Sequence, residues 1–509
     1  MIKSLHILIT FLLFGGSISY AQNTGTKGKN PPPANVELLN ADKVIFDQRK
    51  GDAQRALGNV QVRHDNTLMY CDSAWIYQKR NVLFAFGHLH VKQGDSLNMY
   101  GDSLFYDGNT GYGKLRGHIR MVELDMSMET DSLEFVSKEG RGWYSTGGII
   151  RSAKNKNVLT SKFGEYRSAS KDIFFSGEVM LKHPDYTMTC DTLRYHTPTE
   201  TAWFYGPTVL RTNDGVILCE GGWYNTRKDQ SRFIKNVYMS NGEYKFRGDT
   251  LDYSQKSGLG TARGFFSLYD TTNKSTLSGK YGWFNEKLKS AFVTDSALMM
   301  RPFDDDTLYL HADTLFASRE GKDSTQWMRA WRNVRFFRND VQGMCDTLDY
   351  HEKDSVLNLL GKPVIWQDDQ QLSAQRMEVH FRNKELHRID LIGNCFISSF
   401  ADSLCYNQIK GRTMHGYFKD EKLSHISIKG NGQTIYYAGE KGKPLIGMNK
   451  AECSDIDIYV EENKISNIVF HTEPTATFFP MTKINPKDRF LKDFEWMGDR
   501  RPKKVEDLF

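Results

Sequence analysis

The feature that most constrains this chain is a short motif that returns about every 30 residues. It reads as a small residue, Asp, Ser or Thr, an apolar residue, any residue and an aromatic, as in GDSLFY at Gly101, CDTLRY at Cys190 and GDTLDY at Gly248. Clear and weaker copies place their second residue at 42, 72, 102, 131, 162, 191, 220, 249, 280, 313, 346, 375, 412 and 452. The thirteen intervals span 410 residues, a mean near 31.5, and the first eight lie between 29 and 31. Because chance matches would not keep this spacing, the sequence predicts a repeat array.

A second element lies between the motifs. It begins with Gly and continues with alternating residues, as in GNVQV at Gly58, GHLHV at Gly87 and GEVML at Gly177. Period-two alternation with β-branched and aromatic residues indicates strands, and no stretch shows a sustained helical stripe. A 30-residue unit of two or three strands cannot bury its apolar face alone, so stacking is required. The sequence therefore predicts an all-β fold, an elongated repeat solenoid with about 30 residues per repeat.

The chain divides into five predicted segments. Residues 1–21 resemble a signal peptide, with an apolar stretch at His6–Phe14 and small residues at Ser19 and Ala21. Residues 22–36 are polar with a Pro triplet and are expected to be a flexible leader. Strong repeats occupy 37–300, divergent repeats 301–480, and a C-terminal tail 481–509. The tail's aromatic residues are expected to cover the last rung of the array: Phe490, Phe494 and Trp496.

The faces of the motif decide what the array can do. In a regular strand Asp102, Leu104 and Tyr106 share one face. A buried column of carboxylates at a strand spacing of about 4.7 Å would be strongly repulsive. We therefore expect the Asp to lie at a bend, bonded to backbone N–H groups or facing water, while the Leu and the aromatic turn inward. Calcium-binding solenoids need a denser Gly/Asp pattern than one Asp in 30 residues. Whether the interior is a filled core or an open trough is left undecided by the sequence.

Charge and cysteine content exclude several classes of protein. A formal charge of +5 over 509 residues argues against a dedicated nucleic-acid binder. After residue 21 no apolar run has membrane-spanning length, which predicts a protein that is at most peripheral to membranes. The seven cysteines are odd in number, and four of them occupy the motif's small-residue position, where other copies have Gly or Thr: Cys71, Cys190, Cys219 and Cys345. Structural thiols are favoured over a disulfide framework.

Three segments carry a resemblance to a known family. They are ADKVIF at Ala41, GNVQVRHDNTLMYCDS at Gly58 and GEVMLKHPDYTMTCDTLRY at Gly177. They resemble the OstA/LptA family of periplasmic lipopolysaccharide-transport proteins, well over about residues 37–270 and more diffusely to about 480. The resemblance implies an open, twisted β-jellyroll whose apolar trough holds lipid A acyl chains. This chain is about three times longer than the single-domain members, so one chain could replace several stacked subunits.

The resemblance also implies a site, partners and a compartment. The apolar positions of four motif copies are the candidate trough lining: Leu104, Tyr106, Leu133, Phe135, Leu193, Tyr195, Leu251 and Tyr253. The implied ligand is lipopolysaccharide or a related glycolipid. The implied partners are other lipopolysaccharide-transport proteins, joined by edge-strand pairing. The implied location is the periplasm, with association with the outer membrane as an extension of that expectation.

Two other classes of function stay open. A structural or adhesive exported β-solenoid is the main alternative, and a polysaccharide-acting β-solenoid enzyme is the second. We expect no enzyme and no cofactor, because the motifs Gly-x-Ser-x-Gly, His-Glu-x-x-His and the P-loop do not occur and no single Asp stands out from the repeat. His88 and His90 share a strand face, but the sequence indicates no third ligand, so no metal site is predicted.

Overall fold

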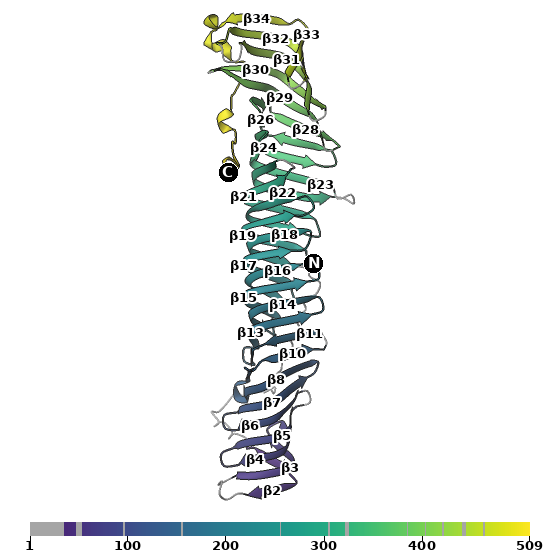
Figure 1. Ribbon diagram of the computed structural model, residues 1–509, viewed down its shortest axis with the longest axis vertical. Coiled ribbons are helices and arrows are strands. Elements are labelled where there is room, and N and C mark those ends of the chain that lie inside the picture. Colours follow the sequence, from purple (N-terminus) through teal and green to yellow (C-terminus); the bar gives the residue numbers. More distant parts are fainter. Residues whose placement is uncertain are drawn as a thin grey trace, which may run out of the picture. The chain divides into compact units, whose positions relative to one another are not determined.

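The computed structural model describes residues 35–46, 53–94, 97–153, 156–254, 256–303, 306–320, 325–383, 385–402, 404–419, 422–439, 444–461 and 464–509. These residues form 34 strands and a few short 3-10 turns, without an α-helix (Figure 1). The predicted all-β class is confirmed. No helix among the described residues is long and apolar enough to span a membrane. The predicted signal peptide 1–21 and most of the leader 22–36 lie outside the described residues.

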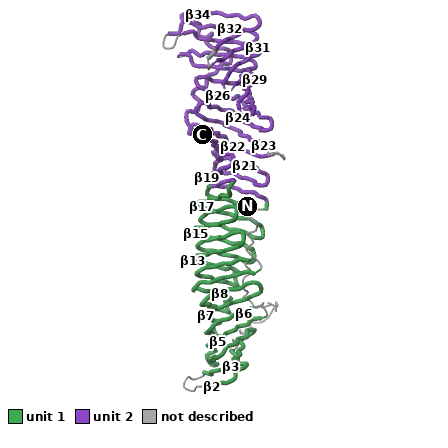
Figure 2. Tube along the Cα trace, turned by 45° about the vertical axis from the view of Figure 1, so that its right-hand side comes forward, with its two compact units in different colours: residues 1–242, 247–256 green, residues 243–246, 257–509 purple. Residues whose placement is uncertain are grey.

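The chain forms two compact units, residues 1–242 with 247–256, and residues 243–246 with 257–509 (Figure 2). The boundary predicted at residue 300 marks the point where the sequence motif becomes less regular, and not a division between compact units. The boundary stays a prediction. Unit 1 holds β1 Glu37–Asn40, β2 Lys43–Phe46, β3 Ala53–His64, β4 Thr67–Tyr77, β5 Val82–Gln93, β6 Leu97–Asp107, β7 Tyr112–Glu123, β8 Met126–Val136, η2 Ser137–Glu139, β9 Arg141–Tyr144, β10 Gly148–Ser152, β11 Asn157–Ser161, β12 Phe163–Arg167, β13 Asp172–His183, β14 Tyr186–His196, β15 Thr201–Thr212, β16 Val216–Asn225, β17 Gln230–Ser240 and most of β18 Tyr244–Ser254.

Unit 2 continues the same pattern of strands and ends in the tail. It holds β19 Leu259–Asp270, β20 Ser275–Asn285, β21 Ser290–Pro302, β22 Thr307–Glu320, β23 Thr325–Phe337, β24 Val341–His351, β25 Val356–Leu360, β26 Val364–Gln367, β27 Gln370–Ser373, β28 Arg376–Arg382, β29 Glu385–Asp402, β30 Cys405–Lys419, β31 Lys422–Ala438, β32 Gly447–Glu461, β33 Lys464–His471, β34 Thr475–Pro480, η3 Met481–Lys483, η4 Pro486–Arg489, η5 Gly498–Arg500 and η6 Val505–Leu508.

Each long strand is bent at its middle. In β3 the antiparallel register shifts between Leu57 and Val60, and the two residues between them, Gly58 and Asn59, have φ values of 71° and 46°. Left-handed backbone at this point suits Gly first and Asn next, which is why the second sequence element begins Gly-Asn or Gly-His. The bulge turns the strand and reverses which side chains face inward.

The bend divides every rung between two layers. The first half of β8 pairs with β10, whereas its second half pairs with β9. We call the layer that contains β10 and β11 layer 1, and the layer that contains β9 and β12 layer 2. In unit 2 the same division puts β26 and β27 in layer 1 and β25 and β28 in layer 2. Each unit is therefore a folded antiparallel sheet with its core between the two layers.

The bend also explains the Asp of the repeat. Asp102 is exposed at the corner of β6, whereas Leu104 and Tyr106 are 3% and 7% exposed. The prediction from a regular strand that Asp102 shares their face is wrong, because the two-residue bulges of the neighbouring strands, at Gly87–His88 and Gly117–His118, lie opposite Asp102 and bend β6 there. The expected position of the Asp at a bend, facing water, is confirmed. A Cβ on Gly117 would lie 2.2 Å from Oδ2 of Asp102, and Gly58, Gly87 and Gly206 show the same relation to Asp42, Asp72 and Asp191. Gly and Asp recur together because the Asp side chain occupies the space that a side chain at the Gly position would need.

The sequence predicted that the tail covers the last rung of the array. The structure shows a different course for most of the tail. The rings of Phe490, Phe494 and Trp496 contact Tyr406 of β30, and Phe494 also contacts Phe396 of β29. The tail lies against layer 1 of unit 2 and runs back along it; Figure 1 draws it in yellow beside β26 and β30. Only its packing near Phe479 of β34 agrees with a terminal cover.

Candidate functional site

The candidate site is the apolar interior between the two layers. The eight residues predicted to line a trough all belong to layer 2 of unit 1, on the second halves of β6, β8, β14 and β18. Their exposed fractions are 0% to 8%. Each therefore lies in the interior. Contact with a guest lipid stays a prediction for all eight: Leu104, Tyr106, Leu133, Phe135, Leu193, Tyr195, Leu251 and Tyr253.

In unit 1 the protein's own side chains fill much of this space. The ring of Tyr144 in layer 2 lies against Gly148 in layer 1, where a Cβ would come within 2.5 Å of the ring carbon Cζ. Nearer the N-terminus, the hydroxyl of Tyr106 in layer 2 lies 3.2 Å from Nδ1 of His64 in layer 1. Aromatic side chains thus join the two layers directly.

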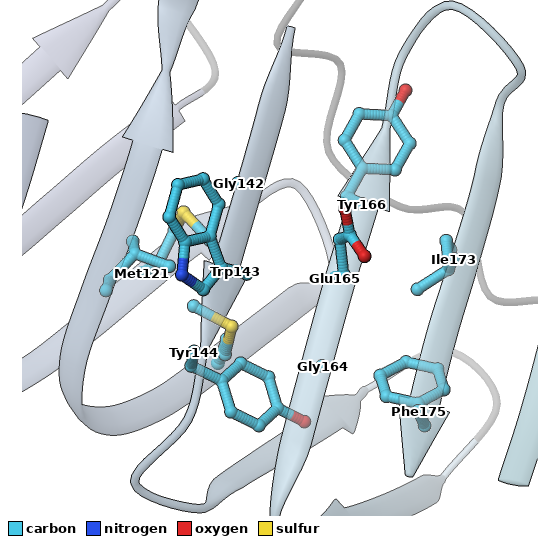
Figure 3. Close-up of a pocket in the computed structure, with 11 residues that line it drawn as sticks. Met121, Gly142, Trp143, Tyr144, Gly164, Glu165, Tyr166, Ile173 and Phe175 are labelled. Atoms are coloured by element: carbon cyan, nitrogen blue, oxygen red, sulfur yellow. The ribbon is translucent and has the colours of Figure 1, made fainter. Parts of the chain in front are cut away.

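A small cavity lies in this interior (Figure 3). Figure 3 shows Tyr144 of β9 and Phe175 of β13 on either side of the layer 2 strand that carries Gly164. Met121 and Met128 of layer 1 complete the lining. Its volume is about 30 Å³, well below the roughly 150 Å³ of a cavity that takes up benzene. An acyl chain of a dozen carbons cannot enter it unless the layers move apart.

The interior of unit 2 is more accessible between β19 and β25. The side chains that face inward near the ends of these strands are partly exposed, whereas their unit 1 counterparts, such as Leu181, Tyr195 and Met239, are 1% to 5% exposed. We call this set the accessible inner face of unit 2; it comprises Leu268, Leu277, Met299, Leu308 and Phe336 in layer 1 and Phe284, Met328, Tyr350 and Leu357 in layer 2. All nine are apolar or aromatic.

Sequence reasoning missed these residues because the motif is degenerate in this region. Two of them were nevertheless marked by it: Phe284 and Tyr350 are the terminal aromatics of GKYGWF and CDTLDY. The aromatic identity of a position predicts that it faces inward. It does not predict whether the space opposite is filled.

Polar groups in the interior are held neutral. Burial raises the pKa of Tyr144 and of Tyr195 to about 12. Burial also raises the pKa of Cys71 to about 11 and that of Cys190 to about 12. All seven cysteines are free, in agreement with the prediction of structural thiols. An interior that suppresses ionisation suits an apolar guest or an apolar core, and does not suit a nucleophile.

The corner histidines belong to the fold rather than to a metal site. Nδ1 of His88 lies 2.8 Å from Oδ2 of Asp72, and His118 makes the same contact with Asp102. A hydrogen bond to the carboxylate raises the pKa of each imidazole. His90, two residues after His88, instead stacks on Tyr100 and bonds to Asn98. The two histidines thus have separate partners.

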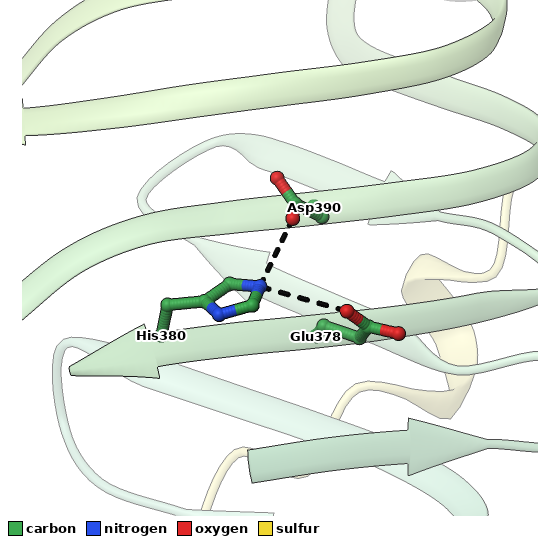
Figure 4. A group of neighbouring side chains, drawn as sticks. All are labelled: Glu378, His380 and Asp390. Atoms are coloured by element: carbon green, nitrogen blue, oxygen red, sulfur yellow. Dashed lines mark hydrogen bonds and ion pairs between the residues drawn. The ribbon is translucent and has the colours of Figure 1, made fainter. Parts of the chain in front are cut away.

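A cluster on the outer face of layer 2 in unit 2 has the residue types of a metal site. Nε2 of His380 lies 2.9 Å from Oδ2 of Asp390 and 3.6 Å from Oε2 of Glu378 (Figure 4). Arg388 also lies 2.9 Å from that Asp390 oxygen, and Arg376 lies 3.2 Å from Glu378. Because two guanidinium groups already balance the two carboxylates, the geometry supports a structural ion network.

Comparison with known proteins supports the resemblance seen in the motifs. Residues 34–191 match the family model of OstA-like proteins, which confirms the predicted kinship with the OstA/LptA family over that range. No curated protein matches the chain. Among solved structures, 21 chains match. One is LptH of Pseudomonas aeruginosa, described as the LptA-homologous periplasmic component of the lipopolysaccharide transport device. It is 12% identical, its match covers 28% of this chain and 95% of LptH, and the TM-score is 0.21.

Proposed function

We propose, from the premise that this chain carries an OstA/LptA-type repeat, that it shields the acyl chains of lipopolysaccharide or a related glycolipid during transfer to the outer membrane. The observation that carries the proposal is the accessible inner face of unit 2, whose partly exposed side chains are apolar or aromatic. Acyl chains that cross an aqueous compartment need apolar contact worth about 0.8 kcal/mol per methylene. A ladder of equivalent rungs supplies that contact without one deep well.

The proposal assigns different roles to the two interiors. The accessible inner face of unit 2 binds a guest without rearrangement, because its apolar side chains are already partly hydrated. The interior of unit 1 admits a guest only when contacts such as Tyr106–His64 and Tyr144–Gly148 separate. The lining role of Leu193, Tyr253 and the other six predicted residues therefore depends on movement of the layers.

The proposed setting follows from the family. LptH is described as periplasmic and as part of lipopolysaccharide transport, and we extend both properties to this chain. The partners would be other proteins of that transport system, paired with the terminal strands by strand addition. We propose a binding role without catalysis or a cofactor.

Two neighbouring methionines give a direct test. Met299 faces inward and Met300 faces outward on β21, and both are partly exposed. A photo-crosslinking amino acid at each position, introduced one at a time, should capture lipopolysaccharide from the cell envelope at Met299 and not at Met300. Equal capture at both positions, or none at either, would contradict binding inside the sheet.

A structural or adhesive solenoid is the second candidate. The packed interior of unit 1 favours it, since a scaffold needs a filled core and no route for a guest. A purified, folded chain with no lipid captured at Met299 would support the scaffold. A sugar-cleaving activity that disappears on substitution of one carboxylate would instead support the enzyme.

A further inference from the structure

The tail of unit 2 is held as a peptide ligand is held. It leaves β34 at Pro480 and follows the outer face of layer 1 as extended segments joined by 3-10 turns. It buries Ile484, Leu491 and Leu508, whereas most of its charged side chains are exposed. None of its described residues joins a strand of the sheet.

Two glutamines grip the tail's main chain in the same way. Gln408 of β30 donates from Nε2 to the carbonyl of Arg489 (2.9 Å) and accepts at Oε1 from the amide of Leu491 (2.8 Å). Gln371 of β27 repeats the grip six residues later, on Glu495 O (2.8 Å) and Met497 N (2.7 Å). Each amide thus bonds to residues i and i+2 of an extended segment, as a neighbouring strand would.

These glutamines have no accessible surface of their own. Gln371 and Gln408 are both 0% exposed. The sheet supplies only part of their hydrogen bonding, since Oε1 of Gln371 accepts from Nε1 of Trp366 (3.3 Å) and Nε2 of Gln408 donates to the carbonyl of Tyr406 (3.1 Å). The main chain of the tail supplies the remaining partners while it covers both amides, and a buried amide group left without a partner would cost about 1–3 kcal/mol. Beyond them Arg501 reaches Oε1 of Gln342 at 2.7 Å, and Arg335 donates to the carbonyl of Asp507 at 3.0 Å. The grip therefore continues from β30 to β23.

The surface beneath the tail is apolar where an outer face is normally polar. Phe396, Ile435, Tyr437 and Met448 are 0% to 3% exposed and form one cluster with Ile484 and Leu491 of the tail. In unit 1 the corresponding outer positions of layer 1 carry residues such as Gln61 and Arg63. The apolar strip and the glutamines together define the tail track: Arg335, Gln342, Gln371, Phe396, Gln408 and Ile435.

We infer that the tail track is a peptide-binding site, that residues 484–509 occupy it in cis, and that the same segment of a second copy binds it in trans. Recognition through the main chain makes the site tolerant of sequence, and the apolar residue whose amide each glutamine accepts, Leu491 or Met497, supplies selectivity. A tethered occupant has an effective concentration in the millimolar range, so exchange requires that the cis segment first be released. The inference is independent of whether the inner face binds lipid.

The test uses the full chain with a site-specific protease sequence inserted between the exposed residues Thr482 and Lys483. After cleavage of the folded chain, a fluorescent synthetic peptide of residues 484–509 should exchange onto the body and displace the cleaved tail. The uncleaved chain should bind the peptide far more weakly. Gln371→Ala and Gln408→Ala should each raise the Kd about tenfold or more, whereas Gln370→Ala, at an exposed neighbour outside the grip, should not change it.

Two results would overturn the inference. If the cleaved tail never exchanges with the peptide, either in the parent chain or in the double variant Gln371→Ala, Gln408→Ala, the tail is a permanent part of the fold. A tail that leaves on cleavage, with a body that keeps its β-sheet circular dichroism and binds no peptide, would show that the track has no affinity of its own.

Discussion

Replacement of Leu193 by Ala tests whether the interior of unit 1 is a filled core. Leu193 is 0% exposed and lies directly between Phe175 and Phe204 of the neighbouring strands, which are 1% and 3% exposed. In such a site Leu→Ala costs about 2–5 kcal/mol, through lost burial and the cavity left behind. The matched control is Leu277→Ala on the accessible inner face of unit 2, where the side chain is already partly hydrated and about 1 kcal/mol is expected.

Native-state hydrogen exchange is the appropriate measurement. A repeat array need not unfold in one step, and its stability is a sum of local and nearest-neighbour contributions. Since about 1.4 kcal/mol corresponds to a factor of ten, the slowest amides of β13, β14 and β15 should exchange on the order of 30- to 3,000-fold faster in Leu193→Ala. Amides of β3 and β4 should keep their rates.

The comparison between the two variants decides the outcome. If Leu193→Ala accelerates exchange no more than Leu277→Ala does, the two interiors are equally open and the packed-core description of unit 1 is wrong. Added lipopolysaccharide gives a second readout, because a ligand that binds only the folded chain slows exchange around its own site. We expect that slowing near Leu277 before it is seen near Leu193.

Three further predictions concern the corners and the buried thiols. The pKa of His118, measured by NMR titration, should lie above 6.5, because the hydrogen bond to Asp102 raises this pKa. In Asp102→Asn the pKa of His118 should fall towards 6.5. The His118–Asp102 pair stabilises the fold below pH 6.5, and this contribution is lost as the pH rises through the raised pKa. An unchanged His118 titration in Asp102→Asn would refute the assignment. Gly117→Ala should destabilise its surroundings in unit 1 by about 1–3 kcal/mol, and by more than Gly147→Ala does. Both glycines have positive φ, but only Gly117 has Asp102 in the space of the new methyl group. Native-state hydrogen exchange of the strands around each glycine would show equal losses in the two variants if backbone strain alone mattered. Finally, Cys71, Cys190, Cys219 and Cys345, whose pKa values burial raises to about 11 or 12, should resist iodoacetamide at pH 8 in the folded chain and react in urea; rapid labelling without denaturant would show that the corner thiols are accessible.

The repeat itself was readable from local chemistry. A strand alternates its side chains with a period of two, so the Leu and aromatic of each motif had to face inward together. Electrostatics placed the Asp outside, because stacked buried carboxylates repel. The bulge that puts the Asp outside and the Leu and aromatic inside was not predicted. The Gly-Asn and Gly-His pairs that form it, such as Gly58–Asn59, were recognised only as the start of a strand.

The sequence by itself determined an all-β repeat array with an apolar inner face, since period, alternation and turn chemistry are local properties of the chain. Only the tertiary structure decided how far that face is filled, because the contact of Tyr144 with Gly148 and the exposure of Met299 depend on how the two layers of each unit approach each other. The course of the tail was equally beyond local pattern: Gln371 meets Met497 across 126 positions of sequence. In the sequence, a glutamine that hydrogen-bonds to a distant peptide main chain cannot be distinguished from any other polar residue on a strand.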